Sequence, residues 1–546
     1  MTALLPDDPQ EGLATNGACS TQPGVAGTIK VGAQTSVGSG MADILQRYAD
    51  RILGVLSCYD RVIIRGRIRE IAYAKGMEMY LRTHGVRQFD FKKFAQPLRE
   101  EIRSNAERLA AEQGITVQFI RHHEQRKEAI VAKILEQRGD APGLVAILSA
   151  LELCPTFEPW HDKETGRTFL RPDRSKCLHY YFYFIDEDLG LCFMRVSTWC
   201  PFGLQVYYNG HNVLAAKLSK AGLEYQMLDN AFTHIDDWKA AQELADESET
   251  RLLHEKLDFY ASCFCPAIRE LGLSYQWNLT QVEYATDVVF RRQADLQPIY
   301  AALVRTAIHA VKPGQVATFL GRKHKLHDNN TEEVGNNFQT RIQGTRIKHH
   351  IGPASIKMYD KAGIILRIET TTNNPKWFKH YRTVAHRDGS TSHELAPLKK
   401  SLYSLYDLQQ LAVAANRRYL AFLSNLDDPT VAFEAVARLS EATQEAGRSY
   451  RGFNLFSAHD LDLLETVLRG ENTIGGFRNA DLRRHMPDKS TGQVSRLLKR
   501  LWTHNLIRKV GGTYKYYVTE PGRAVITTGL KLKELVLIPE LARALA

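Results

Sequence analysis

The sequence of 546 residues lacks the features that mark several common classes of protein. It contains no apolar run of the roughly 18 residues that a membrane helix needs, which argues against a membrane-spanning protein. It also has no P-loop, no glycine pattern of a dinucleotide-binding turn and no nucleophile elbow, which argues against a nucleotide-driven motor and an ordinary hydrolase. Its eight cysteines form no C-x-x-C pair, so we expect reduced thiols in a cytoplasmic protein.

The first forty residues lack the basic start and the apolar core of a signal peptide. They are rich in Gly, Ala, Thr, Ser and Gln and offer little to bury, which predicts a disordered leader over residues 1–40. Met41 opens the first amphipathic helical pattern, over residues 41–56, and is an alternative start codon.

Beyond the leader, helical and strand-like patterns alternate along the chain. Periodicity predicts a helix over 91–114, helical spacing over 281–291, and strands at 59–68, 177–186, 189–198, 203–210 and repeatedly within 315–370. The predicted fold class is therefore α+β, a mixed α/β body with antiparallel sheets plus a C-terminal winged helix-turn-helix. The predicted domains are an N-terminal α/β domain (41–150), an aromatic-strand and helical domain (151–310), a strand-rich then helical domain (311–445) and the winged helix (446–546).

Basic residues are concentrated near the C-terminus. The window 478–533 holds 13 lysines and arginines against three acidic residues, and its surplus equals the +10 net charge of the whole chain. A compact basic face of this kind is the electrostatic footprint of a polyanion partner.

The same region has the element order of a winged helix. A helix follows Ser457, two more cover 477–486 and 490–505, and the Gly511-Gly512 turn joins two short strands. About 75 residues resemble the winged-helix domain of MarR-type regulators, which implies that the third helix enters the major groove of double-stranded DNA. The residues expected to contact DNA are Arg483, Arg484 and Lys499 for phosphates, Thr491, Gln493 and Arg496 for bases, Lys509, Tyr514 and Lys515 in the wing, and Arg500 on the third helix.

The segment 318–370 carries the densest set of polar motifs. Its Lys-x-Tyr-Asp-Lys run, centred on Tyr359, and its Arg-x-Glu run, ending at Glu369, resemble strands of plasmid rolling-circle replication initiators, which nick DNA. The resemblance implies that Tyr359 attacks a phosphodiester, helped by Mg²⁺ or Mn²⁺ that Glu369 and either His349 or His350 would hold. Alternation along the strand places Tyr359 and Asp360 on opposite faces.

A competing hypothesis uses carboxylates alone. Asp60 lies near the start of the first predicted strand, as the first acid of RNase H-like nucleases and transposases does. Glu283 and Asp287 share one face of the predicted helix and would supply further ligands for a pair of metal ions.

Several stretches along the chain, from 179–192 to 367–371, resemble those of a large group of uncharacterised bacterial proteins that end in a MarR-like winged helix. From the winged helix and the possible chemistry of the body, and not from this group, we expect a DNA-binding protein that processes or replicates a mobile element. Two alternatives are open: a non-enzymatic transcription regulator, and an RNA- or single-strand-binding protein that stacks bases on the aromatics of 177–210.

Overall fold

The computed structural model describes residues 44–538, except 122–124, 248, 312, 323–333, 342–343, 425–436, 446, 512, 532 and 534–537. The expected leader over 1–40, Met41 and the Gly512 half of the wing turn lie outside the described residues. No helix in these ranges is long and apolar enough to cross a membrane.

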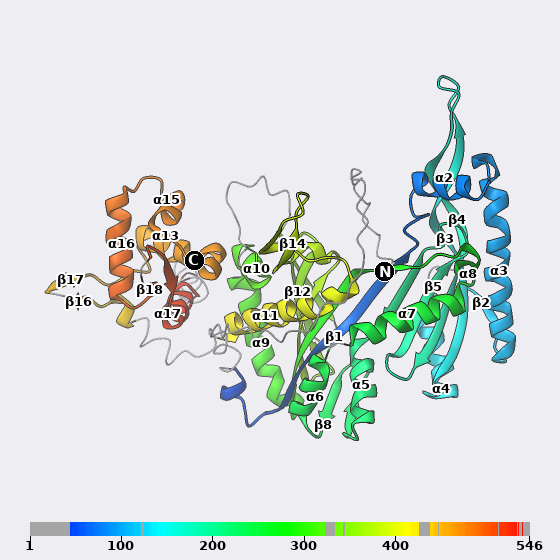
Figure 1. Ribbon diagram of the computed structural model, residues 1–546. Helices are drawn as coiled ribbons and strands as arrows, with labels where there is room; N and C mark the ends of the chain where they lie inside the picture. Colours follow the sequence, from blue (N-terminus) through cyan, green and yellow to red (C-terminus); the bar gives the residue numbers. More distant parts are fainter. Residues whose placement is uncertain are drawn as a thin grey trace. The chain divides into compact units, whose positions relative to one another are not determined.

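One large sheet organises the body of the protein (Figure 1). Among the described residues it has eleven strands in the order β10-β11-β12-β13-β9-β1-β6-β5-β4-β3-β2, and all neighbours are antiparallel except β2 and β3. The chain is therefore a mixed α/β protein with a mostly antiparallel sheet, as predicted. Its strands are β1 (Ile52–Arg67), β2 (Val117–Phe119), β3 (Gly143–His161), β4 (Thr168–Asp186), β5 (Gly190–Ser197), β6 (Leu204–Tyr208), β9 (Gln276–Phe290), β10 (Val334–Arg341), β11 (Gly344–Ile351), β12 (Ala354–Lys361) and β13 (Ile365–Thr372).

The sheet draws strands from all three segments that were predicted as separate body domains. Residue 150 lies inside β3, and strands from 41–150, 151–310 and 311–445 pair with one another. The three segments therefore contribute to one sheet instead of each forming its own.

Helices cover the two faces of this sheet unevenly. A continuous apolar core lies on the face covered by helices α2 (Ala74–Thr83), α3 (Phe91–Glu112), α7 (Thr250–Phe264), α8 (Ala267–Leu271), α9 (Gln293–Ala310), α10 (Pro313–Phe319) and α11 (Leu405–Ser424). Smaller clusters on the other face involve α4 (Lys127–Arg138), α5 (Gly210–Lys220), α6 (Trp238–Asp246) and the hairpin of β7 (Tyr225–Met227) and β8 (Phe232–Ile235).

The strands β9, β12 and β13 show the alternation that creates the site. On β12, Ile356 and Met358 are buried in the main core, whereas Lys357 and Tyr359, which alternate with them, point to the opposite face. Period-two alternation places charged residues of three adjacent strands side by side on that face.

Three local predictions are wrong. Residues 281–291 lie in strand β9 up to Phe290, not in a helix, and residues 52–56 of the predicted first helix belong to β1. Residues 315–319 of a predicted strand belong to helix α10. Short apolar segments fit both periods, and pairing with neighbouring strands decided between them. The helix over 91–114 and the strands of 177–210 are confirmed.

Residues 437–531 form a segment with its own apolar core. It contains β16 (Thr443–Glu445), β17 (Arg448–Tyr450), α13 (Ala458–Val467), α14 (Gly470–Gly475), α15 (Asn479–His485), α16 (Thr491–Thr503), β18 (Ile507–Lys509), β19 (Tyr516–Val518) and α17 (Glu520–Lys531). Ser490 and Gln493 form a reciprocal capping box that fixes the start of α16. The remaining elements are β14 (Lys379–Ala385) with β15 (Thr391–Pro397), and the short 3-10 turns at 88–90, 375–377 and 402–404.

Candidate metal centre

A β-bulge presents the first acidic residue of the site. Strands β1 and β9 pair through Tyr59 with Tyr284 and Arg61 with Glu283, so Asp60 is an extra residue between two paired positions. A bulged residue is left out of the ladder, and the strand bends there. Asp60 therefore lies in the middle of β1, not near its start, and only 7% of it is exposed.

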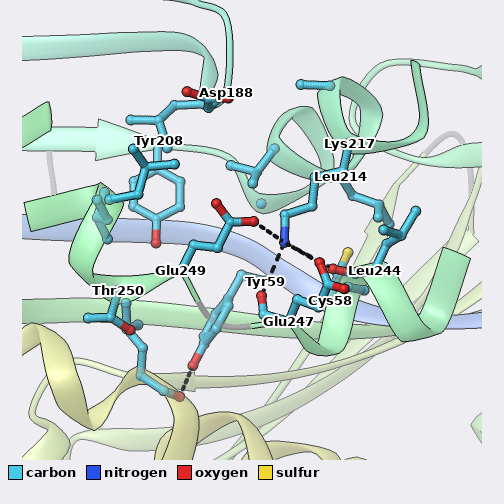
Figure 2. A pocket seen from close by; sticks show the side chains of 18 of the residues that line it. Cys58, Tyr59, Asp188, Tyr208, Leu214, Lys217, Leu244, Glu247, Glu249 and Thr250 are labelled. Carbon is cyan, nitrogen blue, oxygen red and sulfur yellow. Dashed lines mark hydrogen bonds and ion pairs between the residues drawn. The ribbon is translucent and has the colours of Figure 1, made fainter. Parts of the chain in front are cut away.

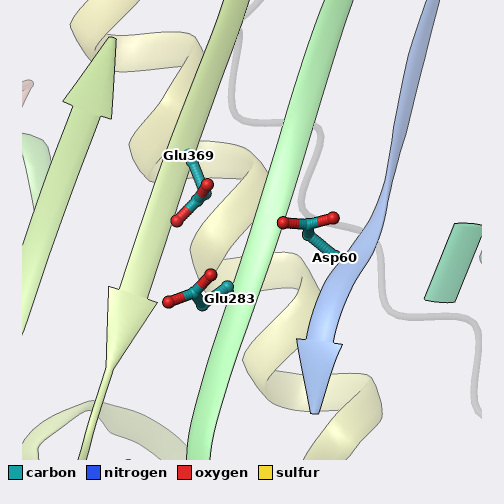
Figure 3. Close-up of side chains that lie close together, drawn as sticks. All are labelled: Asp60, Glu283 and Glu369. Carbon is teal, nitrogen blue, oxygen red and sulfur yellow. The ribbon is translucent and has the colours of Figure 1, made fainter. Parts of the chain in front are cut away.

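Three carboxylates meet across the adjacent strands β13, β9 and β1 (Figure 3). Each of Asp60, Glu283 and Glu369 offers a carboxylate oxygen, and the three oxygens lie within 4.8 Å of one another. All three residues are buried. Buried carboxylates at this spacing repel one another, so the arrangement is stable only with protons or cations among them. Oxygen ligands of this kind suit Mg²⁺ or Mn²⁺. We call these three residues the carboxylate cluster.

Two cations border the glutamates of the carboxylate cluster. The Lys357 ammonium lies 2.5 Å from Glu369 Oε1 and 3.4 Å from Glu283 Oε1, and the Arg61 guanidinium lies 3.8 Å from Glu283. Burial and the charge of Glu369 raise the pKa of Glu283. Burial also opposes ionisation of Glu369, but the Lys357 ammonium outweighs it and lowers the pKa of Glu369. A metal ion could therefore take the place of a proton on Glu283 or of the Lys357 ammonium.

The hydroxyl of Tyr359 joins the cluster directly. It donates a hydrogen bond of 2.9 Å to Glu369 Oε2. Burial and the neighbouring Glu369 raise the pKa of Tyr359 well above its usual value. Asp360 points to the other face, as predicted, and its Oδ1 accepts from the Gly363 amide in the β12–β13 turn.

Asp287 is held by Arg367 and not by the cluster. Arg367 is fully buried and binds Asp287 through two hydrogen bonds of 2.6 Å. The same guanidinium donates to Asp60 Oδ1 at 3.4 Å, to His211 Nε2 at 3.0 Å and to the Asn230 carbonyl at 2.9 Å. Asp287 therefore serves as the partner of a buried cation, and the cluster within the described residues has three carboxylates, enough for one ion.

The two predicted histidine ligands are not part of the cluster. His349 is buried on the opposite face, where its ring nitrogens contact Tyr419 Oη at 3.0 Å and Asn336 Oδ1 at 2.7 Å. Burial and the neighbouring His350 lower the pKa of His349 to about 4. His350 lies one residue along the strand, on the face of the cluster, but it lines a cavity and is not among the grouped ligands.

The site thus unites residues from two competing hypotheses. Tyr359 and Glu369 were expected for one mechanism, and Asp60 and Glu283 for another. The Lys-x-Tyr-Asp-Lys and Arg-x-Glu motifs include Lys357 and Arg367, but neither residue was assigned a role from the sequence. Sequence reasoning missed His211 and Asn230, for which the sequence offers no signal beyond ordinary polar residues in a helix start and a turn.

In the plasmid initiators a glycine-arginine strand precedes the two motifs that Tyr359 and Glu369 carry, but the matching residues of this chain are not in a strand. Gly321 and Arg322 follow helix α10 in a turn, and Gly321 has a positive φ of 75°. This part of the resemblance therefore does not extend to local structure.

The expected DNA-contacting residues of 478–533 divide into two groups. Arg483, Arg484, Thr491, Gln493, Arg496, Lys499, Lys509 and Tyr514 are exposed, and Lys515 is half-buried. Arg500, in contrast, is 7% exposed, pairs with the buried Asp460 at 2.7 Å and donates to the Arg451 and Gly452 carbonyls. Its expected role in DNA contact is wrong, because its charge is neutralised inside the core.

The aromatic residues of 177–210 mostly form core. Tyr180, Tyr181, Tyr183 and Tyr208 are each less than 10% exposed, so their rings are not available for stacking bases.

A second cavity of about 260 Å³ lies beside Tyr59 and Lys217 (Figure 2). The Tyr59 hydroxyl donates to the Leu405 carbonyl, and the Lys217 ammonium contacts the carboxylates of Glu247 and Glu249. Since this lysine is neutralised within the lining, we place no chemistry in that cavity.

No family model, curated protein or solved structure matches this chain.

Arg367→Met should destabilise the body by about 3–5 kcal/mol, because it leaves Asp287 buried without its partner. Adding Asp287→Leu should restore much of that loss, since no charge then remains unpaired. The midpoint of urea unfolding measures both effects. Arg171→Met, which breaks the exposed pair with Glu158, is the matched control and should cost about 1 kcal/mol or less. Equal losses from Arg367→Met and Arg171→Met would contradict the role given to Arg367.

Proposed function

We propose that this protein is a metal-dependent enzyme that nicks DNA through Tyr359, and that its C-terminal segment is a winged helix that selects the site. The observation that carries the proposal is the hydrogen bond from the Tyr359 hydroxyl to Glu369 within the carboxylate cluster. This hydrogen bond joins a candidate nucleophile to a carboxylate that could accept its proton and that belongs to the cluster.

The chemistry follows from these contacts. The Tyr359 oxygen forms a bond to phosphorus while its proton passes to the Glu369 carboxylate. The bond from phosphorus to the 3′ oxygen of the preceding nucleotide breaks, and that oxygen takes up the proton that Glu369 accepted. The products are a 5′-phosphotyrosyl linkage and a free 3′ hydroxyl. A divalent ion held by the cluster would neutralise the phosphate and lower the barrier to phenolate formation.

A tyrosine nucleophile is consistent with a cluster that suits a single ion. RNase H-like hydrolysis uses two ions to activate water and to stabilise the leaving oxygen. Here the fourth acid, Asp287, is paired with Arg367 and is unavailable for a second ion. One ion and a tyrosine nucleophile form a consistent set, and so the initiator-like mechanism is favoured over the two-metal one.

Two observations support a winged helix at the C-terminus. The helices α13, α15 and α16 precede the β18–β19 hairpin in the order that such modules have. Phe477 exchanges two backbone hydrogen bonds with Tyr516, of 2.9 and 2.8 Å, and so adds a short third strand to the hairpin. Exposed basic residues on α16 and in the wing provide phosphate contacts.

The proposed biological role is the processing or replication of a mobile element. Its basis is the resemblance of the Tyr359 and Glu369 motifs to plasmid replication initiators, together with a body far larger than a repressor needs. A non-enzymatic MarR-like regulator is the outcome if no metal supports nicking.

Tyr359→Phe should abolish nicking and the covalent protein–DNA adduct, because the ring is kept and the nucleophile is lost. Glu369→Gln should slow nicking on the order of 100-fold, because the proton acceptor is lost. The assay incubates the purified full chain and supercoiled plasmid carrying its own gene and flanking DNA with Mg²⁺ or Mn²⁺, and scores nicked and protein-linked DNA.

The control for these variants is Tyr381→Phe, an exposed tyrosine on β14 that should leave nicking unchanged. EDTA should stop the reaction, and Asp60→Asn should raise the Mn²⁺ concentration needed for half-maximal rate. Metal-dependent nicking that survives Tyr359→Phe would reject the tyrosine and favour an activated water.

Arg496→Gln and Lys509→Gln should each weaken binding to duplex DNA and reduce the slope of log Kd against log salt by about 1. Fluorescence anisotropy over a salt series measures both quantities. Lys239→Gln, an exposed lysine on α6, is the control for charge. Arg500→Gln should instead lower the melting temperature, because it breaks the buried pair with Asp460. Unchanged salt slopes for the first two variants would reject the segment as the DNA anchor.

A further inference from the structure

A polar cavity of about 210 Å³ opens beside the carboxylate cluster. Glu283, a member of the cluster, and Lys357, which contacts the cluster, both line this cavity. The cavity and the cluster are therefore adjacent. The other lining residues are almost all polar: Gln281, Lys348, His350, Ser355, Thr371 and Asn373, with the turn at Gly352 and Pro353. This volume is below that of pockets for drug-sized ligands and suits a small polar group.

Two lysines face each other across this cavity. Lys348 on β11 is directly opposite Lys357 on β12 in the antiparallel register. Like charges at such positions destabilise a sheet unless something between them carries the opposite charge. Lys357 has Glu369 and Glu283, whereas no carboxylate of the described residues lies within ion-pair distance of Lys348.

The surroundings of Lys348 add to this excess of positive charge. Burial, and then the charges of Lys357 and Arg346, lower its pKa. The ring of His350 also lines the cavity, and it fits there because residue 335 is glycine: a Cβ on Gly335 would lie 2.2 Å from His350 Cε1. Lysine, histidine and hydroxyl groups around a small space are the donors that a phosphate recruits.

A metal ion in the cluster would increase the need for an anion. The ion would take over Glu283 and Glu369, the two carboxylates that now neutralise Lys357. Lys357 would then face Lys348 with neither charge compensated. An anion between the two lysines would restore the balance, so metal and anion are expected to bind cooperatively.

We propose that this cavity binds the phosphate of a nucleotide that neighbours the scissile one on single-stranded DNA. The inference rests on the proposed function, because it assigns the cavity to the same substrate. A recess of this size beside buried ligands admits one strand, whereas a duplex presents two strands held in a wide helix.

The test uses the full chain carrying Tyr359→Phe, so that DNA binds without being cut. A labelled single-stranded 12-mer is titrated with Mn²⁺ present and with excess unlabelled duplex to occupy the C-terminal segment. Lys348→Gln should weaken binding about tenfold and reduce the salt slope by about 0.7, the value for one phosphate contact on a single strand. Lys348→Arg keeps the charge and should restore both quantities.

The control is Lys379→Gln, an exposed lysine on β14. Lys348→Gln with unchanged affinity and slope would overturn the proposal. Equal competition by inorganic phosphate and by the oligonucleotide would show a site for free phosphate and would also overturn it. If the Tyr359→Phe chain binds single strands as expected but the unmodified chain nicks no DNA, the proposed function alone is rejected. Failure of the phosphate site and failure of the proposed function are therefore distinguishable.

Discussion

The site depends on the hydrogen bonds and ion pairs of one buried group, the guanidinium of Arg367. It ties β13 to β9 through Asp287, to β1 through Asp60, to the start of α5 through His211 and to a loop through Asn230. Removing an arginine from water is costly, and the cost is offset only where its donors are satisfied with good geometry. The ring of His211 lies between these groups: its Nε2 is 3.0 Å from the Arg367 guanidinium, and its Nδ1 is 3.3 Å from Asp60 Oδ1.

That network holds Asp60 in place but does not include the other two carboxylates of the cluster. Asp60 is held by Arg367 and by the amides of Asn209 and Asn230. Glu283 and Glu369 face a lysine and a tyrosine instead, both of which can exchange a proton. The cluster therefore combines one tightly held carboxylate with two that contact side chains able to exchange a proton.

The sequence predicted the residue types of the site better than their arrangement. Glu283 and Asp287 were expected to share a face because they are four apart on a helix. They do share a face, but on a strand, where a spacing of four is two periods of alternation. Tyr359 and Glu369 were assigned from the sequence to one hypothetical site, and Asp60 and Glu283 to another. Their meeting in one site depends on strand register and on a bulge, which are set by the pairing of β1 with β9 and of β9 with β13. Local pattern carries no information about such pairing.

The same limit applies to charge. The helices α13, α15 and α16 were predicted within a few residues, since caps and apolar stripes are local signals, whereas α14 and α17 were not predicted. Counting basic residues there nevertheless overstated the basic surface, because Arg500 spans the core to reach Asp460.

An arginine on a helix has the same identity whether it faces solvent or a buried acid, and only the partner distinguishes the two cases. The body contains the opposite case, a basic residue inside the sheet that no acid in the described part of the chain pairs with. Lys348 sits in a sheet without a partner acid among the described residues, and a charge that the fold does not neutralise points to something outside the fold. Paired buried charges therefore contribute to the stability of the fold, whereas the half-buried Lys348, with no partner acid among the described residues, is the basis of the proposed phosphate contact.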